Sequence, residues 1–135
     1  MRTFSFIFIG GFFGSVFRYL ISGTTKEMIS GGIPLHTLLV NVSGCFLLAL
    51  IYGLVATVLT IDEDLTLGMA TGFLGAYTTF SAISGESVQM ILKNDYTNMF
   101  IYLGSTVFFG AVATYCGYLL AKKIADKASN EVTGE

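Results

Sequence analysis

The sequence predicts an all-α membrane protein with four transmembrane helices, and three observations lead to this fold class. Of the 135 residues, 53% are hydrophobic and only 12% are charged, which is unlike the balance of a soluble domain. The mean hydropathy is +0.73. The charged residues also leave four long apolar windows, and a membrane-spanning helix needs about 20 apolar residues. We expect a single membrane domain over residues 1–135, with spans near 3–22, 35–59, 65–91 and 97–121 and a polar tail over 122–135 that frays into solvent.

The first span is the shortest apolar window, and Arg18 lengthens it because its side chain can reach the membrane interface. No A-x-A-like cleavage site follows, so we expect a retained helix rather than a removed signal peptide. Gly10 and Gly14 form a G-x-x-x-G pattern, which is typical of close helix packing.

The second span begins beside His36, which we expect at the membrane interface; one histidine makes no metal cluster. Within the span, Thr37, Asn41 and Gly44 follow the 3.6-residue helical period and so share one face. An amide in an apolar span has two interpretations. Asn41 is either a hydrogen-bonding contact between helices or a donor to an ion in transit.

The third span contains the most informative segment, GFLGAYTTFS from Gly72 to Ser81. Lipid offers no hydrogen bonds to a disturbed backbone, so such a polar, glycine-containing patch is costly unless it lines a cavity or holds an ion. We therefore expect a helix break near Gly75–Thr79. Glu86 lies beyond the break, where a carboxylate is a functional candidate or reaches a vestibule or the lipid headgroups.

The fourth span carries Tyr102, Thr106, Gly110 and Thr114 at four-residue spacing. Hydroxyl groups beside small residues favour close helix packing, although the same hydroxyls can donate to an ion.

The basic residues give a weak topological bias under the positive-inside rule. Four of them fall on one side of the membrane and three on the other, namely Arg2, Lys122, Lys123 and Lys127 against Arg18, Lys26 and Lys93. A chain of this kind can insert in both orientations, and two oppositely oriented copies would form an antiparallel dimer with sites near the midplane.

The polar groups inside the spans are mainly donors: amide N–H, hydroxyl O–H and the positive edges of aromatic rings. Such groups suit a small anion, and carbonyls released at a helix break could hold a cation beside it. The net charge of −2 gives no support for nucleic-acid binding. No nucleophile–base pair or metal-ligand cluster supports an enzyme.

Three motifs, one per helix and in order, resemble those of the Fluc/CrcB fluoride channel family over nearly the whole chain. They are GGFFGSVFRY (Gly10–Tyr19), HTLLVNVSG (His36–Gly44) and GFLGAYTTFS (Gly72–Ser81). The resemblance implies a passive, fluoride-selective channel that exports fluoride from the cytoplasm across the plasma membrane. It also implies a dual-topology antiparallel dimer with two pores and a central structural sodium ion.

The resemblance further implies roles for individual residues. The backbone carbonyls of Gly75 and Thr78 would hold the sodium ion. Arg18 would attract anions into a vestibule, where Glu86 is the other candidate. The implied ion pathway includes Asn41, Phe80, Ile83, Ser81, Thr106 and, from the polar face of the fourth span, Tyr102.

The chain departs from the usual TTFSTF motif of the family, because it has TTFSAI from Thr78 to Ile83. Ile83 has no ring edge to face an anion, and Ala82 and Gly110 replace expected hydroxyl residues. These changes favour pairing with a diverged second subunit, whereas the even charge balance favours a homodimer. A proton-coupled exporter of the small-multidrug type is a further alternative, but the first span lacks the carboxylate that it would require.

Overall fold

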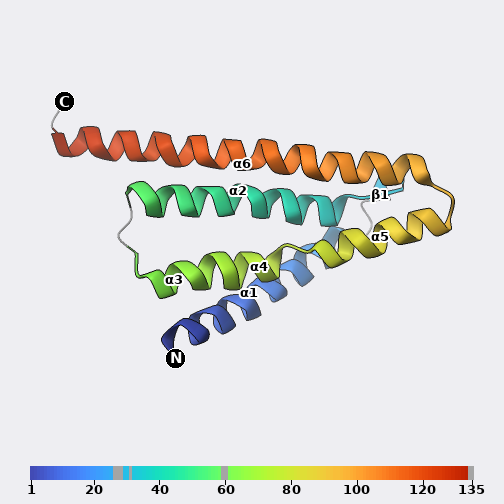
Figure 1. Ribbon diagram of the computed structural model, residues 1–135, viewed down its shortest axis with the longest axis horizontal. Coiled ribbons are helices and arrows are strands. Elements are labelled where there is room, and N and C mark those ends of the chain that lie inside the picture. Colours follow the sequence, from blue (N-terminus) through green and yellow to red (C-terminus); the bar gives the residue numbers. More distant parts are fainter. Residues whose placement is uncertain (26–28, 31, 59–60, 134–135) are drawn as a thin grey trace.

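The computed structural model describes residues 1–25, 29–30, 32–58 and 61–133, and it is almost entirely helical (Figure 1). In chain order its elements are α1 (Arg2–Thr25), β1 (Ile29–Ser30), β2 (Ile33–Pro34), α2 (Leu35–Thr57), α3 (Glu63–Leu67), the π-helix η1 (Gly68–Leu74), α4 (Gly75–Tyr77), α5 (Phe80–Leu92) and α6 (Tyr96–Thr133).

Three helices of the described part of the chain are long and apolar enough to cross a membrane. They cover Arg2–Gly23, Leu35–Thr57 and Tyr96–Ser129 and correspond to the first, second and fourth predicted spans, which confirms the class of all-α membrane protein. The third predicted span, 65–91, corresponds to the series α3, η1, α4 and α5. The end of the second predicted span, residue 59, lies outside the described residues.

The elements run in two opposite directions (Figure 1). α2 and α6 lie side by side and run the same way, whereas α1 and the series from α3 to α5 run the other way. α1 packs against η1 and α4. At the start of α1, Arg2 Nη2 lies 2.9 Å from Asp62 Oδ2, and the Thr3 hydroxyl bonds to Asp64. These contacts tie the first helix to the beginning of the third segment.

Glycines allow α1 to approach the third segment closely. A Cβ atom at Gly10 would lie 2.1 Å from the carbonyl oxygen of Gly68, and one at Gly14 would lie 2.1 Å from that of Phe73. No side chain fits at such distances. The G-x-x-x-G pattern is therefore a close packing contact, as the sequence predicts.

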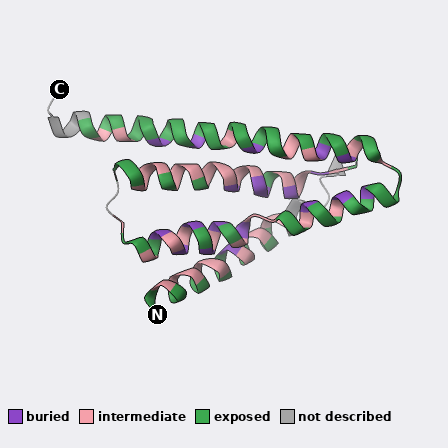
Figure 2. Cartoon of the chain, viewed as in Figure 1, coloured by how far each residue is buried: buried purple, intermediate pink, exposed green. Residues whose placement is uncertain are grey.

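Buried side chains form two small clusters on either side of the junction between α4 and α5. One contains Val40, Leu74 and Tyr77, and the other contains Ile83, Met90, Met99 and Tyr102. Much of the outer surface of α1 and α6 is exposed (Figure 2), and large apolar residues such as Phe8, Phe12, Val107 and Phe108 lie on it. This distribution is typical of helices that face lipid or another subunit.

Two features differ from the sequence predictions. A short antiparallel pair joins β1 and β2, with Ile29 opposite Pro34; its strands are too short to show a sequence pattern. Residues 122–133 of the tail, which was expected to fray, are helical, because α6 continues to Thr133. Alanine and lysine, the main residues of 121–128, favour helix, and extending an existing helix needs no new nucleus.

Candidate functional site

The backbone leaves helical geometry between α4 and α5. Thr78 has φ −75° and ψ 158°, and Thr79 has φ −147° and ψ 117°, so both are extended. They lie within the segment Gly75–Thr79, where the sequence indicates an interruption. The preceding turn is also irregular, since η1 is a π-helix, a form that is rare and frequent at functional sites.

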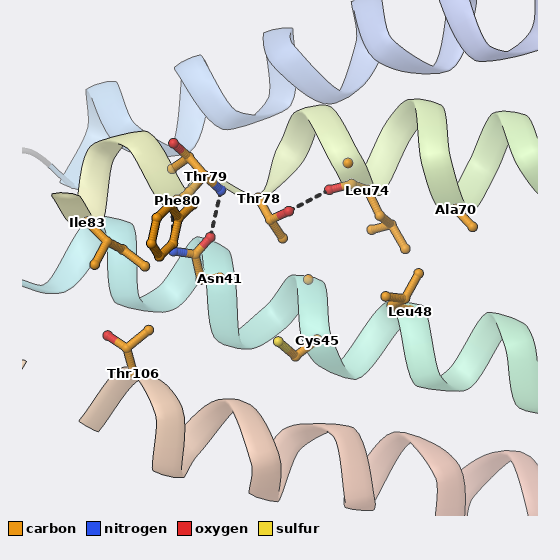
Figure 3. Close-up of a pocket in the computed structure, with 12 residues that line it drawn as sticks. Asn41, Cys45, Leu48, Ala70, Leu74, Thr78, Thr79, Phe80, Ile83 and Thr106 are labelled. Carbon is orange, nitrogen blue, oxygen red and sulfur yellow. Dashed lines mark hydrogen bonds between the residues drawn. The ribbon is translucent and has the colours of Figure 1, made fainter. Parts of the chain in front are cut away.

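Asn41 pairs with both backbone groups of Thr79 (Figure 3). Its Nδ2 donates to the Thr79 carbonyl oxygen at 3.1 Å, and its Oδ1 accepts from the Thr79 N–H at 2.8 Å. The side-chain amide thus pairs with both the N–H and the C=O of Thr79, as a neighbouring β-strand would. Only 8% of Asn41 is exposed, so these bonds are shielded from solvent. One interpretation of Asn41 was a hydrogen-bonding contact between helices. The structure contains such a contact, and it joins the Asn41 side chain to the backbone at the junction.

Two backbone N–H groups therefore donate to side-chain oxygens, whereas in a continuous helix they would donate to backbone carbonyls. The Thr79 N–H is taken by Asn41, and the Ala82 N–H donates to Thr79 Oγ1 at 3.1 Å. In an α-helix these amides would bond to the carbonyls of residues four positions earlier, which are Gly75 and Thr78. The two carbonyl oxygens are thereby available to another donor or to a cation. Among the described residues there is no cluster of three or more His, Cys, Asp or Glu side chains that could hold a metal.

Gly44 allows α2 to lie against the junction, since a Cβ atom there would be 2.2 Å from Thr78 Cγ2. The three residues predicted to share one face of α2, Thr37, Asn41 and Gly44, are all buried. That face is therefore the one that packs against the third segment and α6.

A pocket of about 360 Å³ opens beside the junction. Its walls come from α2, the third segment and α6 and are mostly apolar (Figure 3). The lining residues include six of those predicted from the sequence: Asn41, Gly75, Thr78, Phe80, Ile83 and Thr106.

Phe80 and Ile83 meet this pocket in different ways. Phe80 is 81% exposed, so its ring stands on the surface at the pocket mouth. Ile83 is buried in the cluster with Met90, Met99 and Tyr102. The Thr106 hydroxyl donates to the Tyr102 carbonyl within α6 at 2.8 Å.

The other predicted residues lie elsewhere. Arg18 and Ser81 line a second, more polar pocket of about 480 Å³. Ser81 Oγ is 3.1 Å from Thr79 Oγ1. Tyr102 is fully buried, and its hydroxyl donates to Glu86 Oε2 at 2.5 Å. Neither Ser81 nor Tyr102 lines the pocket around Asn41. Ser81 is still connected to that pocket through Thr79, which lines both pockets.

Sequence reasoning missed the role of Thr79, which contributes both backbone groups to Asn41 and caps α5 with its hydroxyl. A threonine three residues before the capped amide is a recognisable N-cap pattern, so the signal was present in the sequence. The contact between Ser43 Oγ and the Tyr77 hydroxyl, at 2.8 Å, had no comparable signal because it joins two helices far apart in the chain.

These features define a class: an all-α membrane protein whose third segment is interrupted beside a pocket, with an asparagine holding the interrupted backbone. Comparison with known proteins gives the family. The family described as CrcB-like protein, Camphor Resistance (CrcB), matches residues 5–118, and the chain belongs to this family.

Curated relatives cover almost the entire chain. A protein of Flavobacterium psychrophilum named Fluoride-specific ion channel FluC is 35% identical over 92% of this chain and 100% of its own length. Fluoride-specific ion channel FluC 1 of Bacillus anthracis is 34% identical over 97% of both chains. Fluoride-specific ion channel FluC 2 of Bacillus cereus is 38% identical over 82% of this chain and 90% of its own. These names describe ion channels, which agrees with the prediction that the chain is not an enzyme.

Proposed function

We propose that this protein is a passive fluoride-selective channel of the plasma membrane that exports fluoride from the cytoplasm. The observation that carries the proposal is the interrupted segment at Thr78–Thr79, held by Asn41, in a chain whose relatives are named fluoride-specific ion channels over nearly their whole length. The proton-coupled exporter has no comparable support, because the described part of α1 contains no carboxylate.

The ion pathway is proposed to run past the pocket at the junction. Asn41 has a second amide hydrogen besides the one given to Thr79. Thr106 adds a hydroxyl group, whose one hydrogen would have to leave the Tyr102 carbonyl to reach the ion. The exposed Phe80 ring can turn its positive edge toward a fluoride ion. Ser81 and Tyr102 belong to the proposed path beyond this point, toward Glu86 on α5. Ile83 occupies the position where the family has a second ring.

A structural sodium ion is proposed at the carbonyls of Gly75 and Thr78. The chemistry of the donors supports this, because both carbonyls lose their helical partners to the arrangement around Thr79. Carbonyl oxygens are suitable ligands for a hard cation. Two carbonyls are too few to surround an ion, so the same pair from a second subunit would complete the site.

The proposed channel is an antiparallel dimer of two chains, each a single domain with the segment from α3 to α5 as its third, broken span. The pocket that opens beside Phe80 supports this, because a ring that is 81% exposed would gain a covering wall from the partner. A homodimer is the simpler arrangement. Bacillus cereus strain ATCC 10987 has both a FluC 1 and a FluC 2. Pairing with a second, diverged subunit is therefore the alternative that the experiment must distinguish from a homodimer.

The test is efflux from liposomes that contain the purified chain alone. A fluoride electrode should record rapid passive release without a pH gradient, and chloride release should remain at the level of protein-free liposomes. Equal chloride flux, or strict dependence on a proton gradient, would contradict the proposed channel. Fluoride flux that appears only with a second homologue would indicate a heterodimer. Replacing sodium by N-methyl-D-glucamine on both sides should lower the flux of a channel that depends on the sodium ion.

A further inference from the structure

An apolar groove of about 390 Å³ lies between α1 and α2, over α3 and η1. The two long helices separate toward the N-terminal end of α1, and α3 lies between them there (Figure 1). Every side chain that lines the groove is apolar. Ile9 and Phe13 of α1 and Leu65 of α3 remain 52%, 51% and 39% exposed along it. The groove is therefore open on the outer surface of the helices.

This apolar groove is separate from the pocket at the helix junction. Three residues that a partner subunit would cover in the proposed dimer, Gly75, Thr78 and Phe80, line the pocket but not the groove. On α2 the pocket includes Leu48 and the groove includes Leu47, and successive residues of a helix point about 100° apart. A second copy that covers Phe80 thus leaves the groove to face the membrane.

An acyl chain of a lipid is the occupant that fits this groove. Water is excluded, because a bound water needs several polar partners, and an empty groove loses the dispersion contacts of its walls. Along α1 the groove extends from Phe6 to Phe13, a rise of about 10 Å at about 1.5 Å per residue. One leaflet of the hydrocarbon core is about 15 Å deep. The groove can therefore hold most of a chain that enters from the nearer leaflet.

An ion pair marks the level at which the headgroup of this lipid would lie. Arg2 Nη2 is 2.9 Å from Asp62 Oδ2. Phe6 follows Arg2 by one turn of α1, and Leu65 follows Asp62 by about one turn of α3. Both Phe6 and Leu65 line the groove. The apolar groove thus begins one turn below charged side chains, as the acyl chains of a bilayer begin below the headgroups.

The side-chain charges beside this opening are mainly negative. Arg2 lies 2.9 Å from Asp62 and 3.8 Å from Asp64. Glu63, in the first turn of α3, is exposed, and its side chain has no ion pair or hydrogen bond within the part of the chain that the structure describes. The C-terminal half of α6, which carries three lysines, lies on the far side of α2 (Figure 1). A positively charged end of a headgroup is therefore attracted here, and a purely anionic headgroup is repelled.

We propose that the apolar groove binds an acyl chain of a zwitterionic phospholipid with a primary ammonium headgroup, such as phosphatidylethanolamine, and that the ammonium group pairs with Glu63. A primary ammonium group can donate three hydrogen bonds, whereas the headgroup of phosphatidylcholine has no N–H and phosphatidylglycerol is an anion. Exposed ion pairs are weak, so we expect about a threefold preference over phosphatidylcholine. The groove contains no residue of the proposed ion pathway, so the lipid site does not depend on the channel function.

The first test uses tryptophan fluorescence. The chain has no tryptophan, so Ile9→Trp places a single indole at the edge of the groove. The variant is reconstituted in phosphatidylcholine with a small fraction of lipid whose acyl chains are brominated, because bromine quenches indole on contact. Brominated phosphatidylethanolamine should quench as though present at about three times its bulk fraction, and brominated phosphatidylcholine in proportion to its fraction. Val112→Trp, on the exposed surface of α6 and outside the groove, is the matched control and should report both lipids in proportion.

The role of Glu63 is tested in the same Ile9→Trp protein. Glu63→Gln should remove the preference for phosphatidylethanolamine. Asp126→Asn, which removes an exposed carboxylate from α6, should keep it. Three results would overturn the proposal: equal quenching by the two zwitterionic lipids, stronger quenching by brominated phosphatidylglycerol, or no quenching of Ile9→Trp by any lipid. The last result would show that another protein chain covers the groove.

The second test uses the wild-type protein and does not depend on the folding of a tryptophan variant. Native mass spectrometry in a neutral detergent compares the three phospholipids, with identical acyl chains and at equal concentrations. Phosphatidylethanolamine should be retained about three times as often as phosphatidylcholine and phosphatidylglycerol least, and Glu63→Gln should lose this order. Equal retention of the three lipids would refute the site. Fluoride efflux from the same preparations is measured separately, so failure of the lipid site and failure of the channel function are distinguishable.

Discussion

Replacement of Asn41 should stop fluoride flux, because this one side chain satisfies both backbone groups of Thr79 at the helix junction. Asn41→Leu removes both hydrogen bonds, the one at 3.1 Å and the one at 2.8 Å. Asn41→Asp keeps an acceptor for the Thr79 N–H but loses the donor to the Thr79 carbonyl. It also places a negative charge on the proposed path, where a carboxylate repels fluoride.

The expected size of the effect follows from these two bonds. A buried polar group that loses its partner costs about 1–3 kcal/mol, so Asn41→Leu should destabilise the extended junction by about 2–6 kcal/mol. Even about 2 kcal/mol lowers the population of the intact junction about 30-fold. Asn41→Asp should abolish flux altogether, since the charge adds its own cost in the membrane.

The assay is fluoride efflux from liposomes, with size-exclusion chromatography in detergent to show that each variant still assembles. Ser43→Ala is the matched control. It lies two residues away on α2 and loses the contact with the Tyr77 hydroxyl but does not line the pocket at the junction, so efflux should be retained. If the assembled Asn41→Asp protein conducts fluoride within about twofold of wild type, a difference below about 0.5 kcal/mol, Asn41 is only a packing contact and the assignment of the pathway is wrong.

Three further substitutions test the packing and the aromatic positions. Gly14→Ala should lower the melting temperature in detergent, since its Cβ would lie 2.1 Å from the Phe73 carbonyl oxygen and overpacking costs about 1–3 kcal/mol; Gly23→Ala, where nothing lies within 4 Å, should not. Phe80→Ile should reduce fluoride efflux about tenfold if a ring edge contributes about 1.4 kcal/mol, and undiminished efflux would refute a role for ring edges. Ile83→Phe should preserve or raise the efflux of a chain that conducts alone, whereas no response in a poorly conducting chain would point to a second subunit.

The sequence was most informative where the membrane restricts the chemistry. Apolar windows predicted the limits of α1 and α2 and the start of α6 within a few residues, because length and charge spacing suffice for a span. The four-residue spacing of Gly10 and Gly14 predicted a close helix contact, because few other functions require this spacing in an apolar helix. The buried face of α2 followed from the helical period of Thr37, Asn41 and Gly44.

The sequence could not show how the polar groups are paired. Asn41 had two interpretations because the residue itself does not reveal its partner, and Thr79 lies 38 positions later in the chain. The His36–Glu86 contact likewise joins positions 50 residues apart by an interhelical approach. The helical tail was missed for a different reason: polarity was taken as a sign of fraying, whereas the helix propensity of its alanines and lysines decided the outcome.

The length of α6 has a practical consequence. Its 38 residues make a rod of about 57 Å at about 1.5 Å per residue, and the hydrocarbon core of a bilayer is only about 30 Å thick. The C-terminal turns must therefore project well clear of the lipid, carrying Lys122, Lys123 and Lys127 with them. A fluorescent protein or an epitope fused there would stand away from the membrane. In an antiparallel dimer it would mark both faces of one channel, so labelling from each side of a sealed vesicle would report how every copy had inserted.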